Sequence, residues 1–427
     1  MLTIRDAEEI KRRWAGRLLE QEDVAARVRQ IIAAVRAEGQ AAVRRYTWEL
    51  DGVELTAAGF RVTKKEIDAA YGAVAADLVA AIRAAAANVE AYHRRQYRGS
   101  WLEPDVNGNI LGELCRPLRR VGLYVPGGTA AYPSSVLMTA IPARVAGVQE
   151  IVLATPPQRD GSVNPLLLVA AAETGVQEIY KMGGAQAVAA LAYGTEEVDG
   201  VDKIAGPGNI YVTLAKKEVY GQVDIDMLAG PSEIIVIADA AARPDWVAAD
   251  LLSQAEHDPL AGAVLLTPEA SLARAVIGEV AAQLQQLPRR DIAASSLANY
   301  GAAVVVDDLP AALELASALA PEHLELYLAD PWQWLGRVKN AGAIFLGPYS
   351  SDPLGDYWCG PSHVLPTAGT ARFYSPLSVD TFVKKSSLIA ASSSGLKQAG
   401  SHIQALARAE GLEGHARAIA LRMEGEA

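Results

Sequence analysis

The chain has 427 residues, a length that suggests two or three domains. Hydrophobic residues make up 51% and charged residues 21%, values that are typical of a globular protein. Its net charge of −11, with no basic block to offset it, argues against a nucleic-acid partner. No uncharged apolar run reaches the roughly eighteen residues of a membrane span. The start, MLTIRDAEEIKRRW, is charged where a signal peptide is apolar, so we expect a cytoplasmic protein.

The two cysteines, Cys115 and Cys359, lie far apart in the sequence. In a reducing compartment we expect both to be free thiols with packing roles. Neither belongs to a CxxC pair, which excludes a four-cysteine zinc site.

Residues 1 to about 112 alternate charge and alanine at helical spacing, with Ile31, Ile32 and Val35 on one apolar face. The alanine-rich stretch from Ile67 to Tyr92 predicts one or two long helices. No motif in this part of the chain indicates chemistry.

From Arg119 onward the pattern changes to strand, turn and helix. Strands are predicted at residues 121–125, 151–154 and 179–182, with a helix at 134–146. Gly147 and Gly175 open two nearly identical segments, GVQEI at 147–151 and at 175–179. Each glycine is placed to end a helix in the left-handed conformation, which predicts successive βαβ units.

Glycine-rich turns follow these strands at residues 126–128 (PGG), 183–186 (GGAQ) and 206–209 (GPGN). All would lie at the carboxyl edge of a parallel sheet, where open α/β sheets bind ligands and helix N-termini attract phosphates. None has the GxGxxG pattern. A dinucleotide site and tight turns without a ligand are both open.

A second group of elements begins with the turn at residues 229–233 (AGPSE) and the buried strand from Glu233 to Ile237. Pro244 then opens a helix that runs to Gln254 and His257. Residues three apart share a helix face, so this amide and this imidazole could bind one cation. The alternative is that they cap the last turn of the helix.

Further strands are predicted at residues 264–266, 304–306 and 343–346, with helices at 269–287 and 310–319. Glu322 and His323 directly precede a short apolar strand. They supply two proton acceptors with different intrinsic pKa values, as general acid/base chemistry requires. The alternative is a capping glutamate beside a core histidine.

The segment from Gly347 to Ser378 is long and irregular, and its content of Asp356, Tyr357 and His363 argues for function over disorder. Asp356 and His363 are candidates for a metal ligand and a substrate contact, or for an Asx turn and a surface imidazole.

A helix is predicted from Gly400 to Arg422, with a break between Gly411 and Gly414. Glu410 and His415 would lie about 140° apart on an unbroken helix. A terminal helix with little core of its own tends to pack elsewhere, for example on another subunit.

Taken together, these motifs resemble the histidinol dehydrogenase family, nearly end to end from Arg44 to His415. Each motif alone is weak, but the ordered set is specific. It comprises VPGG at 125–128, GGAQ at 183–186, GPGN at 206–209, AGPSE at 229–233, QAEH at 254–257, PEHLE at 321–325, GDY at 355–357, HVLPT at 363–367, and Glu410 with His415.

The resemblance implies an α/β fold of two incomplete Rossmann-like domains with parallel sheets, plus small helical extensions that mediate domain-swapped dimerisation. One implied domain comprises residues 22–123 and 234–376 and carries the zinc and acid/base residues, and a second, residues 124–233, lies on the dinucleotide side. Residues 1–21 and 377–398 would form a small extension, and residues 399–427 the exchanged tail.

The same resemblance implies a homodimer that oxidises L-histidinol with two NAD⁺ and one Zn²⁺ per subunit, in the last steps of histidine biosynthesis. His323 would be the general base, and Glu322 would activate water. The zinc ligands would be Gln254, His257, Asp356 and His415; the further substrate contacts Ser134, Ser232, Tyr357, His363 and Glu410; and the dinucleotide contacts Tyr124, Gln186 and Asn209. Glu410 and His415 would come from the neighbouring subunit.

Three other functions compete with this interpretation. Related dehydrogenases that act on other alcohols share the zinc scaffold. A zinc hydrolase could use the same Glu-His pair to activate water against an amide or ester. A metal-dependent binding protein would need no catalysis at all.

Overall fold

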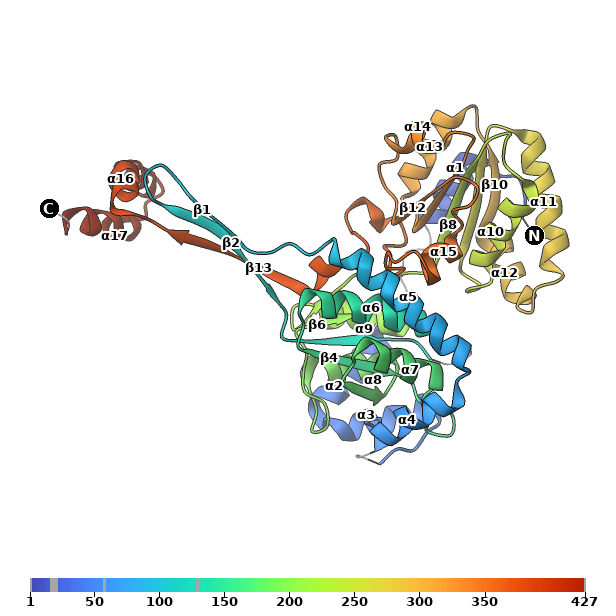
Figure 1. Ribbon diagram of the computed structural model, residues 1–427, viewed down its shortest axis with the longest axis horizontal. Helices are drawn as coiled ribbons and strands as arrows, with labels where there is room; N and C mark the ends of the chain where they lie inside the picture. Colours follow the sequence, from blue (N-terminus) through green and yellow to red (C-terminus); the bar gives the residue numbers. More distant parts are fainter. Residues whose placement is uncertain (1, 16–21, 57–58, 128–130, 426–427) are drawn as a thin grey trace. The chain divides into compact units, whose positions relative to one another are not determined.

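The computed structural model describes residues 2–15, 22–56, 59–127 and 131–425, which form two compact units (Figure 1). The first unit comprises Met1–Gln96 and Leu118–Phe382, and the second comprises Tyr97–Pro117 and Val383–Ala427. The first unit contains two five-stranded sheets, both parallel throughout. The expected pair of Rossmann-like parallel sheets is therefore confirmed.

The first parallel sheet has the strand order β5-β4-β3-β6-β7. Its strands are β3 (Arg120–Tyr124), β4 (Glu150–Thr155), β5 (Glu178–Lys181), β6 (Lys203–Ala205) and β7 (Asp224–Ile225). One helical layer contains α2 (Glu22–Glu38), α3 (Gln40–Tyr46), α8 (Gly184–Tyr193) and α9 (Ile210–Val219), with the π-helical turn η1 (Thr47–Asp51). The other contains α4 (Lys64–Ala73), α5 (Ala76–Arg94), α6 (Pro133–Ala146) and α7 (Pro165–Thr174).

The second parallel sheet has the order β10-β9-β8-β11-β12. Its strands are β8 (Glu233–Ala238), β9 (Gly262–Thr267), β10 (Gly301–Val305), β11 (His323–Tyr327) and β12 (Ala343–Leu346). One face is covered by α10 (Pro244–Ala255), α11 (Ala270–Leu284) and α12 (Arg290–Tyr300), and the other by α1 (Ala7–Ala15) and α13 (Leu309–Leu319). Shorter helices are α14 (Trp332–Leu335), α15 (Asp352–Tyr357), η3 (Thr370–Arg372) and η4 (Val379–Phe382).

The sequence explains the central strands well. Every residue of β3, β8, β9 and β11 is buried. Continuous aliphatic runs suit strands that are covered on both faces, since neither face needs polar side chains. Gly147 and Gly175 end α6 and α7 in the left-handed conformation, and Pro244 opens α10, as predicted.

The second unit is an antiparallel sheet with two helices. The sheet has the order β1-β2-β13, formed by β1 (Trp101–Pro104), β2 (Ile110–Pro117) and β13 (Val383–Ala390). The helices are α16 (Ser393–Ala409) and α17 (Glu413–Glu424), which pack on each other. The extensions are therefore not helical only: β2 and β13 pair over eight residues that lie far apart in the sequence, a pairing that local pattern does not reveal.

The helical segments pack differently from the expected domain parts. Residues 22–94 were expected with 234–376, but Val28, Ile31 and Val43 share a hydrophobic core with Tyr124 and Val152 of the first sheet. Residues 1–21 were expected with 377–398, whereas Ile10 and Trp14 are buried against the second sheet. Amphipathic periodicity marks an apolar helix face but does not say which sheet the face covers.

Several boundaries also differ from the predicted ones. The helix α12 was not anticipated, and α15 lies within the segment that was expected to be irregular. The terminal helix starts at Ser393, and the predicted break occurs at Gly411, which has φ 76°, while Gly414 lies inside α17. Gly128 and Thr129 of the first glycine turn lie outside the described residues.

Among the residues described, no single helix is both long and apolar enough to cross a membrane. The helices α4 and α5 meet that criterion only together, and they are bent by 113°.

A buried ion pair fixes the turn after β6. The ammonium group of Lys216 pairs with the carboxylate of Asp226, and their side chains are 2% and 0% exposed. Lys216 Nζ also donates to the Gly206 carbonyl (3.0 Å), and Asp226 accepts from the Gly206 N–H (2.7 Å). A Cβ at Gly206 would lie 2.1 Å from the Tyr124 carbonyl oxygen, so only glycine fits there.

We predict that Lys216→Met lowers the free energy of unfolding by about 3 kcal/mol, because it leaves the Asp226 carboxylate buried without its counter-charge. The neighbouring Lys217 is exposed, and Lys217→Met should change stability by less than about 0.5 kcal/mol. Urea unfolding of both variants measures the difference. Equal midpoints for the two would show that the pair contributes nothing to stability.

Candidate functional site

The candidate acid/base residues lie at the amino edge of the second sheet. His323 is the first residue of β11 and Glu322 directly precedes it, next to the start of β8. Because α10 runs back from the far end of β8, it brings its C-terminus, with Gln254 and His257, to the same edge. The parallel register thus brings residues 69 positions apart into contact, since Gln254 Nε2 lies 3.3 Å from His323 Nδ1.

His323 is buried and surrounded by oxygen atoms. Its Nδ1 lies 2.9 Å from the backbone carbonyl of Glu233 and 3.6 Å from a carboxylate oxygen of Glu322. Its Nε2 lies 3.1 Å from Asp352 Oδ1. Burial lowers the pKa of His323, but the carboxylates of Asp352, Glu322 and Asp356 outweigh it and raise the pKa to about 9.

Glu322 is buried too, and its carboxylate accepts a hydrogen bond from the Glu233 N–H (2.9 Å). Burial raises the pKa of Glu322 to about 8, although the neighbouring imidazole partly opposes this shift. A raised pKa makes each of these two adjacent side chains a stronger proton acceptor in its deprotonated form, which is the property that general base catalysis needs.

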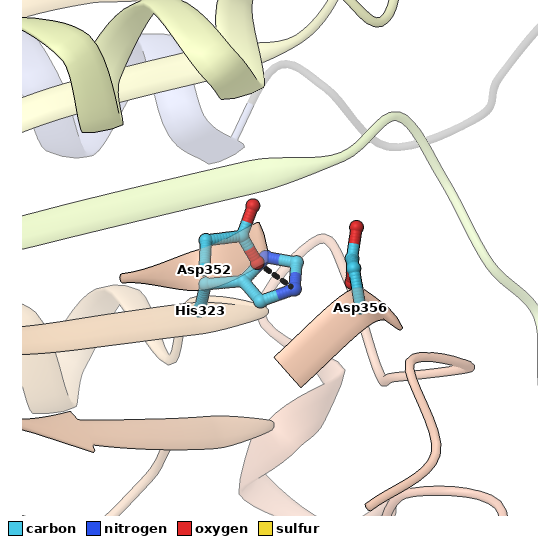
Figure 2. A group of neighbouring side chains, drawn as sticks. All are labelled: His323, Asp352 and Asp356. Atoms are coloured by element: carbon cyan, nitrogen blue, oxygen red, sulfur yellow. Dashed lines mark ion pairs between the residues drawn. The ribbon is translucent and has the colours of Figure 1, made fainter. Parts of the chain in front are cut away.

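His323, Asp352 and Asp356 form a cluster whose ligand atoms all lie within 4.8 Å of one another, and Figure 2 shows them facing a common space. Asp352 and Asp356 come from opposite ends of α15. Within the described residues, neither His323 Nε2 nor Asp352 Oδ1 has a partner in hydrogen-bond geometry. Buried donors and acceptors are rarely left unmet, so this space has the character of a binding site.

A second layer of carboxyl groups lies behind this cluster, and the sequence analysis missed it. Glu325 on β11 accepts a hydrogen bond from the Asp352 N–H (2.9 Å) and shares a hydrogen bond with Asp250 of α10. Burial raises the pKa of Asp352 and of Glu325, and that of Asp250 to about 6. The signal for Asp352 was an aspartate directly before Pro353, which marks a helix start.

The loop after α15 brings His363 into the site. Its Nδ1 lies 3.7 Å from Asp356 and its Nε2 lies 3.1 Å from the hydroxyl of Ser135 on α6. Burial lowers the pKa of His363, while Asp356 partly opposes this. Ser134, the predicted residue, is buried one position earlier on the same helix.

The remaining predicted residues fall into two groups. Ser232 directly precedes β8, where its carbonyl accepts from the Gly262 N–H (2.9 Å), and Tyr357 follows Asp356 at the end of α15. Glu410 and His415 are exposed on α16 and α17 of the second unit. The first unit by itself therefore carries every predicted site residue except these two.

A cavity of about 860 Å³ lies at the carboxyl edge of the first sheet. It is lined by the three predicted dinucleotide contacts: Tyr124 at the end of β3, Gln186 on α8, and Asn209, whose side chain caps α9. Tyr124 accepts a hydrogen bond from the Gly184 N–H (3.1 Å), and burial raises its pKa to about 12. Gln186 Oε1 is buried with no partner among the described residues.

The residues at the two sites fit the zinc ion and the dinucleotide that the sequence suggested. The amino-edge site offers imidazole, carboxylate and amide donors, the set that suits a divalent transition metal. The cavity offers unmet polar atoms and two helix N-termini, those of α8 and α9, which favour a phosphate-bearing ligand.

Comparison with known proteins gives a consistent result. A profile of the family described as histidinol dehydrogenase matches residues 16–423. The histidinol dehydrogenase of Moorella thermoacetica is 76% identical over 424 residues, which cover 99% of this chain and 100% of that protein. The crystal structure of histidinol dehydrogenase from Elizabethkingia anophelis is 38% identical, has a TM-score of 0.95, and covers 100% of this chain and 98% of that chain.

A more distant structure shares the fold alone. An acetylating aldehyde dehydrogenase from Geobacillus thermoglucosidasius is 14% identical, with a TM-score of 0.52 over 87% of this chain and 97% of that one. By contrast, the family profile covers residues 16–423, and the Moorella and Elizabethkingia proteins cover 99% and 100% of this chain. The chain therefore belongs to the histidinol dehydrogenase family of oxidoreductases.

Proposed function

We propose that this protein oxidises L-histidinol to L-histidine through L-histidinaldehyde, with two successive hydride transfers to two NAD⁺, in the last steps of histidine biosynthesis. The observation that carries the proposal is the buried Glu322–His323 pair beside a carboxylate and imidazole cluster, in a chain of this family. The reaction takes place in the cytoplasm, and the free thiols of Cys115 and Cys359 fit a reducing compartment.

One Zn²⁺ per subunit would be held by Gln254, His257 and Asp356, together with His415 of the partner subunit. When bound, the ion supplies a fixed anchor for the imidazole and amine of the substrate. The side chain of Gln254 is buried against His323, which keeps its amide at the site. His257 follows the C-terminus of α10, close enough to Asp352 and His363 to interact with them electrostatically.

His323 removes the alcohol proton in the first oxidation. Its Nδ1 is occupied by the Glu233 carbonyl and Glu322, so Nε2 is the atom available to the substrate. In the second oxidation Glu322 takes a proton from the water that attacks the aldehyde. Its raised pKa favours proton acceptance, because a more basic carboxylate is a better general base.

The remaining predicted residues position the two reactants, the substrate and NAD⁺. The substrate is bound by Ser134, Ser232, Tyr357 and His363, together with Glu410 of the partner subunit. The cavity with Tyr124, Gln186 and Asn209 binds NAD⁺. The homodimer exchanges its C-terminal tails, which is consistent with the exposed apolar side chains of Leu406, Leu412 and Leu421 on α16 and α17.

We predict two NADH for each L-histidinol consumed, a yield that separates this function from a zinc hydrolase or a binding protein. His323→Asn and Glu322→Gln should lower kcat by about 10² to 10⁴ and leave substrate affinity nearly unchanged, because they remove proton transfer and not binding. Glu322→Gln should slow oxidation of supplied histidinaldehyde as strongly as that of histidinol.

Nicotinamide absorbance in single-turnover and steady-state assays measures these effects. The control is Glu314→Gln, which removes a carboxylate from the exposed face of α13 and should behave as the unmodified enzyme. Turnover without NADH, or wild-type kcat in both site variants, would contradict the mechanism.

We predict that chelation abolishes activity and that Zn²⁺ restores it. Asp356→Asn should weaken zinc affinity by at least about tenfold, since a neutral amide replaces an anionic ligand. Asp352→Asn is the matched control, because Asp352 belongs to the same cluster but not to the proposed ligand set. Competition with a chelator measures zinc affinity in both variants. If the Asp352 variant loses zinc and the Asp356 variant retains it fully, the ligand is Asp352 and not Asp356.

We predict that two inactive variants, Glu410→Ala and His257→Ala, regain activity when they are mixed, dissociated and reassociated. Each mixed dimer would contain one intact site, assembled from the unmodified His257 of one subunit and the unmodified tail of the other. Free reassortment should recover about one quarter of wild-type activity, because half the dimers are mixed and half of their sites are intact. Mixed dimers that are formed but inactive would show that the tail serves its own subunit.

A further inference from the structure

Asp51 is the one carboxylate among the residues that line the dinucleotide cavity. Its Oδ2 is buried and has no hydrogen-bond partner within the described residues. It lies at the end of the π-helical turn η1, where Gly52 follows in the left-handed conformation with φ 71°. Turns of this kind are rare in proteins, and those that occur are often found at functional sites.

Asp51 as a whole is half-buried, and a buried oxygen without a partner, such as its Oδ2, costs free energy. The charge of Asp51 acts on Tyr124, so the carboxylate lies near a proposed dinucleotide contact. Asp51 thus lines the space that a ligand would fill, and a pair of hydroxyl donors is the chemistry that would satisfy its oxygen atoms.

The cavity contains none of the candidate catalytic or zinc-binding residues. The nicotinamide ring has to reach those residues, so the cavity holds the half of the dinucleotide that does not react. Ile31, Leu50 and Pro157 supply an apolar surface for the adenine ring. Arg27, which lies 3.6 Å from a carboxylate oxygen of Glu49, and Arg159 also line the cavity and carry the positive charge that suits a pyrophosphate.

We propose that Asp51 accepts hydrogen bonds from the adenosine ribose hydroxyls and so selects NAD⁺ over NADP⁺. This inference rests on the proposed NAD-dependent function. A 2′-phosphate would place two negative charges beside a desolvated carboxylate and remove one hydroxyl donor.

Binding of NAD⁺ and NADP⁺ to the zinc-loaded dimer, measured by calorimetry without substrate, tests the proposal. The unmodified protein should bind NAD⁺ at least about tenfold more tightly than NADP⁺. Asp51→Asn should weaken NAD⁺ binding about tenfold, the loss of one hydrogen bond to a charged group, and narrow the preference by a similar factor. Glu54→Gln removes an exposed charge three residues away, outside the cavity lining, and should change neither affinity.

The pH dependence of NAD⁺ binding gives a second readout that needs no variant. Burial raises the pKa of Asp51 to about 6, so its carboxylate loses its charge as the pH falls through that value. Affinity should decrease from pH 7.5 to 5.5 in the unmodified protein and not in Asp51→Asn. Among the described residues, the other ionisable side chains that line the cavity are those of Arg27, Arg159, Tyr124 and Tyr211, so no second carboxyl group and no imidazole is part of this lining.

The outcomes separate the inference from the proposed function. Unchanged NAD⁺ affinity and selectivity in a folded Asp51→Asn protein, or tight NADP⁺ binding by the unmodified protein, would overturn the role of Asp51 alone. Failure of the unmodified protein to bind NAD⁺ would overturn the proposed function as well. If Asp51→Asn does not fold, Asp51→Ser and the pH series on the unmodified protein decide the question.

Discussion

The burial of His323 among carboxyl groups is the constraint on which the site depends. The imidazole lies 3.1 Å from Asp352 and 3.6 Å from Glu322, and all three side chains are nearly inaccessible to water. Burying several ionisable groups is expensive unless charges and protons are shared among them. The fully buried strands β8, β9 and β11 supply the apolar core that compensates for this cost.

The two parallel sheets use opposite edges. In the first sheet, Tyr124, Gln186 and Asn209 lie beyond the carboxyl ends of the strands, as is general for open α/β sheets. In the second sheet, Glu322 and His323 lie at the amino ends, where the C-terminus of α10 and the short helix α15 converge. This arrangement keeps the ionisable cluster apart from the cavity of the first sheet.

A buried network of carboxyl groups extends behind the cluster of His323, Asp352 and Asp356. Glu325 accepts a hydrogen bond from the first N–H of α15 and shares another with Asp250. These two hydrogen bonds fix the start of the helix that carries Asp356. Glu233 plays a similar part, since its N–H binds Glu322 and its carboxylate accepts from the Ala368 N–H (3.0 Å). Precise placement of reacting groups requires this kind of support.

The sequence by itself determined the parallel strands, the glycine and proline positions that end or begin helices, and the type of chemistry that the Glu-His pair can perform. These features are local: a buried aliphatic run, a left-handed glycine such as Gly147 or a proline at a helix start depends on a few neighbouring residues. Gln254 with His257, Glu322 with His323, and Asp356 were separate local candidates, and only the resemblance to a family joined them into one site, because no local rule links residues so far apart.

Only the tertiary structure decided which surfaces meet. It assigned α2 to the first sheet, paired β2 with β13, and brought Asp352, Glu325 and Ser135 into the site. It also showed that Asp51 lines a cavity and that its Oδ2 is buried without a partner among the described residues, although nothing in its sequence context distinguishes it from a surface aspartate. Packing between segments far apart in the chain depends on shape and burial, and a one-dimensional pattern records neither.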